Sequence, residues 1–140
     1  MKRLMLLILA VFGVASSISA RLGDSGDQIE DSYGSILQRR LRDDGKVTIV
    51  YRKDRFLIFV TFADGRSISE SYSHVKSTDL SEREIAKWLK VNSAGATWTP
   101  ENTGSGRRYK RSDGKAEAIY GTLNGRPTLS VREVRARRSH

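Results

Sequence analysis

From Lys46 to Val75 the pattern of side chains along the sequence has a period of two residues, which is the periodicity of a β-strand. Turn residues near 53–54 lead into the run RFLIFVTF at 55–62, which is apolar at both even and odd positions. A strand that is apolar on both faces is typical of the middle of a sheet. The segment therefore predicts an antiparallel meander with this run at its centre, and few other folds accommodate it.

The turn at Ala63-Asp64-Gly65 decides which face the following serines occupy, namely Ser67, Ser69 and Ser71. A two-residue Asp-Gly loop would place these serines on the same face as Ile58. A three-residue loop with Gly65 in the left-handed conformation would place Ile68 and Tyr72 there instead. Strand register follows the hydrophobic pattern when one face is buried, so we expect the three-residue loop and an inward-facing Ile68.

Two segments have the spacing of helices. The first, with Ser25 or Asp27 as N-cap, places its apolar residues at helical intervals: Ile29, Tyr33, Ile36, Leu37 and Leu41. Gly34 interrupts this stripe, and it is either tolerated inside the helix or ends a short helix. The second segment, DLSEREIAKWLKVN at 79–92, has a capping box formed by Ser81 and Glu84. Its spacing predicts that Trp88 faces the core.

Residues 107–134 predict a second meander. Asp113-Gly114 and Asn124-Gly125 are preferred in tight hairpin loops, and they set the register of the three strands. Upstream, Trp98 is expected in a short strand or as an anchor of the loop. The predicted register places Tyr109 opposite Ala118 and Ala118 opposite Val131, with Tyr120 opposite Leu129; on the other face it aligns Lys110, Glu117 and Arg132.

The first twenty residues have the layout of a secretory signal peptide: two cations, an apolar run and small residues. The alternative is an uncleaved membrane anchor, but the apolar run is shorter than the roughly 20 residues that span a bilayer. We expect cleavage after Ala20 or slightly upstream. The chain contains no cysteine, so we expect neither a lipoprotein nor a disulfide. The predicted organisation is a signal peptide at 1–20, one α+β domain at 21–134 and a basic mobile tail at 135–140.

Positive charge is concentrated at the C-terminal end. The chain has a formal net charge of +9, and residues 107–140 contain 10 lysines and arginines against 3 acids. Such asymmetry can indicate an anionic partner, or simply solvated strand faces. The residues nearest the end of the last predicted strand, or beyond it, are Arg132, Arg135, Arg137 and Arg138.

No pattern in the sequence indicates catalysis. The two histidines, His74 and His140, are far apart and lack cysteine partners, so no metal centre is predicted. Nucleophile elbows, zinc-protease helices and phosphate loops are missing. Ser73 and His74 are neighbours on a strand and point to opposite faces, which disfavours a nucleophile and base. We expect no enzyme and no cofactor.

The order of DSYGS, the first meander, LSEREIAKWLKVN, a tryptophan and GKAEAIYG resembles a group of small exported bacterial proteins of uncharacterised function. The resemblance spans residues 29–131. The layout is also similar to the β-lactamase-inhibitor-like fold and to outer-membrane assembly lipoproteins built on it, although this chain lacks their lipid-bearing cysteine. Those relatives bind proteins through a sheet face, so the resemblance implies binding rather than catalysis.

These observations predict an α+β fold of two antiparallel meanders, each preceded by a helix, as one sheet or two packed halves. We expect a non-catalytic binding or structural module, exported to the periplasm or the cell exterior, whose partner is another exported or envelope protein. The alternative is binding of an anionic polysaccharide or lipid surface through the four C-terminal arginines; export makes nucleic acid a poor candidate. The predicted protein-binding surface is Val50, Leu57, Phe59, Ser67, Ser69 and Ser71.

Overall fold

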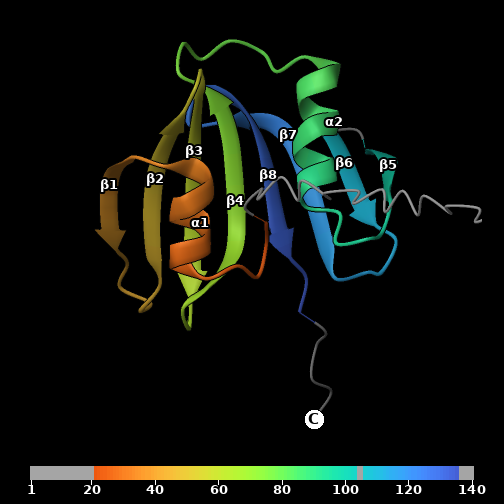
Figure 1. The fold of residues 1–140 in the computed structure, drawn as a ribbon. Helices are drawn as coiled ribbons and strands as arrows, with labels where there is room; N and C mark the ends of the chain where they lie inside the picture. The colour runs from red at the N-terminus through yellow and green to blue at the C-terminus, as the bar shows by residue number, and fades with distance from the viewer. Residues whose placement is uncertain (1–20, 104–105, 136–140) are drawn as a thin grey trace, which may run out of the picture.

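One antiparallel sheet of eight strands organises the computed structural model, which describes residues 21–103 and 106–135. Both helices lie on the same side of this sheet (Figure 1). The elements in chain order are α1 (Gly26–Tyr33), β1 (Ile36–Leu41), β2 (Val47–Lys53), β3 (Phe56–Ala63), β4 (Arg66–His74), α2 (Glu82–Val91), β5 (Trp98–Thr103), β6 (Gly106–Arg111), β7 (Ala116–Leu123) and β8 (Arg126–Glu133).

The sheet is made of two similar halves. In each half a helix precedes four consecutive antiparallel strands, and the strand order β1-β2-β3-β4-β8-β7-β6-β5 joins the halves where β4 pairs with β8. The α+β class and the two meanders are therefore confirmed, and the meanders form one sheet. As a result β1 and β5 are the two edge strands, and the middle of the sheet is built from the last strand of each half.

The first helix is shorter than the apolar stripe suggested. Gly34 follows α1 with a φ of 77°, and its amide donates to the carbonyl of Glu30. A glycine in this conformation ends the helix, so the alternative of a short helix is the observed one. Ile36, Leu37 and Leu41 consequently belong to β1 instead of a helix, and this edge strand was missed.

Both helix starts follow from local sequence. Ser25 and Gln28 form a capping box on α1, and Ser81 and Glu84 form one on α2. In each pair the serine hydroxyl accepts from a backbone amide of the first turn while the partner side chain accepts from the serine amide. The prediction for α2 is confirmed, and of the two candidate caps of α1 the structure uses Ser25.

The β3–β4 hairpin differs from the prediction. Asp64 and Gly65, with φ values of 52° and 75°, form a two-residue loop in which Ala63 pairs with Arg66. The extra residue is Ile68 of β4, which lies between Ser67 and Ser69. It is opposite the point on β3 where the register shifts, between Thr61 and Phe62. Backbone hydrogen bonds from Gly23 to Ser67 and from Ser67 to Asp24 tie the N-terminal segment to this bulged end of β4.

The bulge changes which residues are buried. Ser67 faces the core and is 1% exposed, whereas Ile68 is only half-buried, so both predictions for this pair were wrong. Beyond the bulge the expected register holds, with Ile58 paired to Tyr72 and Thr61 to Ser69. A β-bulge supplied the one-residue shift that we assigned to the loop.

We expect substitutions at this bulge to have small effects. Ser67→Ala should be neutral or slightly stabilising, because the buried Ser67 hydroxyl has no hydrogen-bond partner among the described residues. Ile68→Ala should cost about 1 kcal/mol, well below the ~2–5 kcal/mol expected for Ile58→Ala in the core. Urea unfolding of the three variants measures this order, and a larger loss for Ile68→Ala than for Ile58→Ala would contradict it.

The second meander has the predicted register. Tyr109 pairs with Ala118, Ala118 with Val131, and Tyr120 with Leu129. Trp98 begins β5, and its indole N–H donates to the carbonyl of Leu89 at 2.7 Å. The core lies between the helices and one face of the sheet, and it includes Ile29, Tyr33, Tyr51, Phe56, Ile58, Val60, Tyr72, Ile85, Trp88, Leu89, Leu129 and Val131.

Candidate functional site

Among the described residues, no helix lies over the side of the sheet away from α1 and α2 (Figure 1). We call this side the open face. Directly paired residues project from the same side of a sheet. The cross-strand pairs that run from β1 through β2, β3 and β4 to β8 therefore identify the central residues of the open face. They are Gln38, Arg40, Thr48, Val50, Leu57, Phe59, Thr61, Ser69, Ser71, Ser73, Thr128, Ser130 and Arg132.

Hydroxyl groups dominate the centre of the open face. The Oγ atoms of Ser71 and Ser130 are 3.2 Å apart across the β4–β8 junction. The Oγ1 atoms of Thr48 and Thr61 are also 3.2 Å apart, between β2 and β3. Each hydroxyl retains further hydrogen-bonding capacity, since it has both a donor and two acceptor lone pairs. The alternating serines therefore belong to a hydroxyl row that crosses both halves of the sheet.

Two hollows lie on this face. One, of about 420 Å³, has Phe59 and Leu123 on its walls and Ser71, Ser73 and Arg126 among its other residues. The other, of about 570 Å³, lies near the β3–β4 turn. Its lining residues include Ile68, Ser69, Arg42 and Arg135. The two hollows share Arg42 and Thr61, so they adjoin along the same face.

The charge of the open face is positive. Basic side chains outnumber acidic ones: Arg40, Arg52, Arg108, Lys110 and Arg132 stand against Glu101 and Glu117. Lys110 is paired with Glu101 at 3.3 Å, and Arg132 with Glu117. Arg52 and Arg108 make no ion pair with any residue that the structure describes. The face thus combines apolar, hydroxyl and cationic groups.

The structure brings together most of the predicted protein-binding surface. Phe59 is 36% exposed at the centre of the open face, and Leu57, Ser69 and Ser71 are half-buried there. Val50 also belongs to this face, between Gln38 of β1 and Phe59 of β3, but it is only 6% exposed. The prediction that Ser67 belongs to this surface is wrong, since the bulge turns its side chain toward the helices. Sequence reasoning missed Ser130, Thr128 and Leu123, because they come from the other half of the sheet.

The structure describes two of the four predicted polyanion-binding residues, Arg132 and Arg135. Arg132 lies within β8 and its guanidinium is held by Glu117. Arg135 is exposed and borders the larger hollow of the open face. Arg137 and Arg138 lie outside the described residues. The two arginines that the structure describes therefore contribute to the open face.

A buried polar cluster lies on the opposite, helix-covered side of β4. Glu70 is 0% exposed and pairs across the strands with Val60 and Val131. Tyr72 donates to one carboxylate oxygen at 2.7 Å, and Tyr33 donates to the other at 3.5 Å. Burial raises the pKa of Glu70 to about 7, although the hydrogen bonds from the tyrosines oppose that shift.

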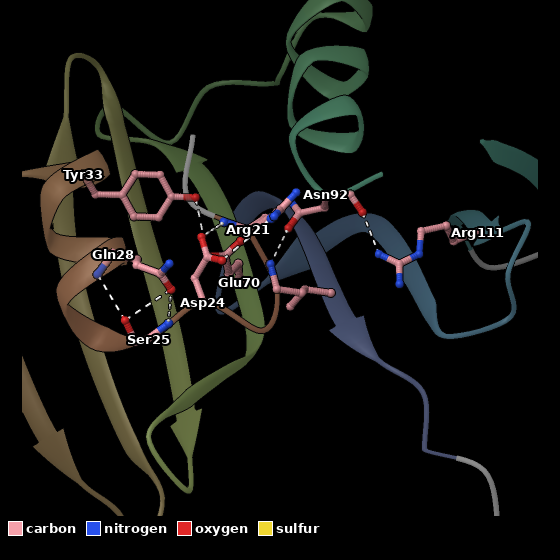
Figure 2. Close-up of polar contacts among 9 residues, drawn as sticks. Arg21, Asp24, Ser25, Gln28, Tyr33, Glu70, Asn92 and Arg111 are labelled. Carbon is pink, nitrogen blue, oxygen red and sulfur yellow. Dashed lines mark hydrogen bonds and ion pairs between the residues drawn. The ribbon is translucent and has the colours of Figure 1, made fainter. Parts of the chain in front are cut away.

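The N-terminal segment and the end of α2 close over this cluster (Figure 2). The side chain of Asn92 donates to the Tyr72 hydroxyl at 3.0 Å and accepts from the amide of Leu22 at 3.1 Å. Arg111 donates to the carbonyl of Asn92 from the second half of the sheet. The cluster therefore joins the segment after Ala20 to both halves. Sequence reasoning missed Glu70, although the alternation that turns Tyr72 inward also turns Glu70 inward.

The side chain of His74 is held by two neighbouring side chains. One ring nitrogen is 2.8 Å from the carboxylate of Glu84, and the other is 2.6 Å from the hydroxyl of Thr78. Burial would raise the pKa of Glu84, but hydrogen bonds from Ser81 and His74 outweigh it and lower the pKa to about 2. Since Glu84 also belongs to the α2 capping box, these contacts fix the start of α2 to the end of β4.

Within the described residues, no group of three or more histidine, cysteine, aspartate or glutamate side chains could hold a metal ion. Among the same residues, no helix is both long and apolar enough to cross a membrane. Neither observation assigns an activity. The open face and its hollows present apolar, hydroxyl and cationic groups to a partner.

Comparisons with known proteins identify no family. No protein-family model and no curated protein matches the chain. One solved structure with a similar arrangement is a cysteine-rich secretory protein from Staphylococcus aureus, with 11% sequence identity and a TM-score of 0.47. The match covers 79% of this chain and 44% of that protein, so this chain spans less than half of its length.

Proposed function

We propose that this protein is an exported, non-catalytic module that binds another exported or envelope protein through the open face. The observation that carries the proposal is the asymmetry of the sheet. Helices cover one side, whereas the other presents Phe59, Leu123 and two adjoining hollows among hydroxyl groups. Exposed apolar groups ringed by polar ones are typical of interaction sites.

The charge of the open face indicates the character of the partner. Arg52 is exposed and Arg108 is half-buried, and neither charge is balanced by an ion pair within the described chain. A partner with acidic side chains around an apolar contact would complement both features, and complementary charge adds specificity and speeds association. An anionic polysaccharide or lipid surface, the alternative partner, would meet the same cations.

Placing the protein outside the cytoplasm rests on residues 1–20. Their layout is that of a signal peptide, and export would give the module access to envelope or secreted partners. Mass spectrometry of the N-terminus of the mature protein tests this directly. We expect a chain that begins at or close to Arg21; retention of Met1 would contradict export by cleavage.

Site-specific photocrosslinking tests the binding surface. We expect a photoreactive phenylalanine at position 59 to form a crosslinked product in the envelope fraction of cells that make the protein. The same residue at position 83, an exposed site on α2, serves as the matched control. Once the product is identified, its affinity for the purified protein should fall at least tenfold with Phe59→Ser and with Arg108→Glu, because these remove apolar and charge complementarity.

The control variant Arg83→Glu makes the same charge change on the helix side, and we expect it to bind as the wild type does. Equal crosslinking from positions 59 and 83 would contradict the proposal. So would a partner whose affinity is lowered by Arg83→Glu and unaffected by the two open-face changes. Thermal unfolding of each variant verifies that an affinity loss is not a loss of fold.

A further inference from the structure

The edge strand β1 is exposed along its whole length. Each of its six residues is exposed, and three of them are aliphatic: Ile36, Leu37 and Leu41. Leu41 reaches 79% exposure, the highest among the exposed large hydrophobic residues of the described chain. Proteins normally protect such edges, because an unpaired strand offers a row of free hydrogen-bonding groups to other chains.

The hydrogen bonds of β1 show which backbone groups are free. The amide of Arg42 donates to the carbonyl of Lys46 at 2.9 Å, so position 42 faces β2. Hydrogen-bonded and non-hydrogen-bonded pairs alternate along an antiparallel ladder. In the register that pairs Arg39 with Ile49 and Leu41 with Val47, the amides of Arg39 and Leu41 therefore point away from the sheet.

The opposite edge strand, β5, is protected at a position whose backbone nitrogen points away from the sheet. The amide of Ser112 donates to the carbonyl of Thr97, so the same alternation makes position 100 of β5 face outward. That residue is Pro100, which has no N–H and is a common means of blocking strand addition. Between its bounds β1 has no proline. The sheet thus has one closed edge and one edge able to accept a strand.

The side chains of β1 favour an acidic occupant. Arg39 and Arg40 are exposed, and neither forms an ion pair with another residue in the part of the chain that the structure describes. Pairing with a second copy of β1 would bring both arginines of each strand into one short interface, and like charges across strands are unfavourable. Arg39 and Arg40 project from opposite faces of β1, and Leu41 shares the face of Arg39. A strand that alternates acidic and aliphatic residues can place its acidic side chains beside Arg40 and its aliphatic ones beside Leu41.

We propose that β1 is a docking edge, and that an acidic, extended segment of another protein adds to the sheet beside it. Strand addition of this kind takes its affinity from main-chain hydrogen bonds and its specificity from alternate side chains. The amides of Arg39 and Leu41 provide the free donors. Arg40 also belongs to the open face, but the docking edge is formed by the backbone of β1, which the function proposed above does not use, so the two proposals can fail independently.

Hydrogen exchange with a model peptide tests this site. The probe is an acetylated, amidated octapeptide of alternating valine and glutamate, added to the wild-type protein. We expect exchange of the Arg39 and Leu41 amides to slow at least tenfold at saturating peptide. A peptide in which lysine replaces glutamate should bind at least tenfold more weakly, because its lysines meet Arg40 with like charge.

Two variants of Arg39 distinguish the contribution of its backbone amide to peptide binding from that of its side-chain charge. Arg39→Pro removes an outward amide without removing a hydrogen bond to β2, and it should lower peptide affinity at least tenfold. Arg39→Gln retains that amide and should lower affinity only a few-fold. Circular dichroism verifies the fold of each variant, and the exchange experiment on the wild type does not depend on either one.

Three results would overturn the proposal. One is an unchanged exchange rate at Arg39 and Leu41 when peptide is bound, with protection on the open face instead. Another is equal affinity for the glutamate and lysine peptides. The third is a wild-type dimer in sedimentation that Arg39→Pro converts to a monomer, which would assign the edge to a second copy of this chain.

Discussion

Replacing Glu70 with glutamine is expected to remove much of the pH dependence of stability between about pH 4.5 and pH 7. The buried carboxyl has a folded pKa of about 7 against an ordinary value of 4.5. In that interval the folded protein binds the proton more tightly than the unfolded chain does. Wild-type stability should therefore be highest near pH 4.5 and should fall by about 3 kcal/mol by the time pH exceeds 7.

Urea unfolding at pH 5 and pH 8 measures this effect. Glu70→Gln carries no titrating group, so it should be clearly more stable than the wild type at pH 8 and much closer to it at pH 5. Glu30→Gln, an exposed acid on α1, is the matched control and should follow the wild type at both values. A stability difference between wild type and Glu70→Gln that is the same at pH 5 and pH 8 would contradict the argument.

Trp88→Ala is expected to be the most damaging single truncation, with a loss of about 3–5 kcal/mol. The indole is 3% exposed and stacks on Tyr72, with ring centroids 4.2 Å apart and planes inclined by 13°. Phe56 and Tyr33 meet it edge-on at 5.2 and 6.3 Å. Removing the ring would leave a cavity where α2 joins the first half of the sheet.

Two further tryptophan variants refine this test. Trp88→Phe should cost much less than Trp88→Ala, because an aromatic ring is retained and the buried indole N–H has no hydrogen-bond partner in the described chain. Trp98→Ala should also cost less, since Trp98 is only half-buried, although it loses its bond to Leu89. Thermal and urea unfolding give the order, and a Trp98→Ala variant less stable than Trp88→Ala would contradict it.

Much of the fold could be predicted because local signals agreed with the final structure. The second meander is the clearest case, since Asn124-Gly125 forms a two-residue loop with Leu123 paired to Arg126. The capping box at Ser81 and Glu84 likewise starts α2 where expected. These features depend on residues within a few positions of one another, so the tertiary structure had little to add.

The errors in the first half have a different origin. Helical spacing of Ile36 and Leu41 was misleading, because a strand beginning after Gly34 can use the same aliphatic residues. At the β3–β4 hairpin the hydrophobic pattern correctly required a shift of one residue but could not locate it. The N-terminal segment, which contacts Ser67 through Gly23 and Asp24, lies at that point in the structure, and no local pattern reveals a contact so distant in sequence.

For the candidate site, the sequence by itself determined that Leu57, Phe59, Ser69 and Ser71 share one face of a meander, because alternation is a local property of strands. Only the tertiary structure decided that neither described helix covers this face and that the face continues into β8. Two consequences depend on that assembly: Glu70 is buried between the halves, and β1 is left at an open edge. Both result from pairing β4 with β8, a contact between residues about 60 positions apart whose partner no short-range pattern specifies.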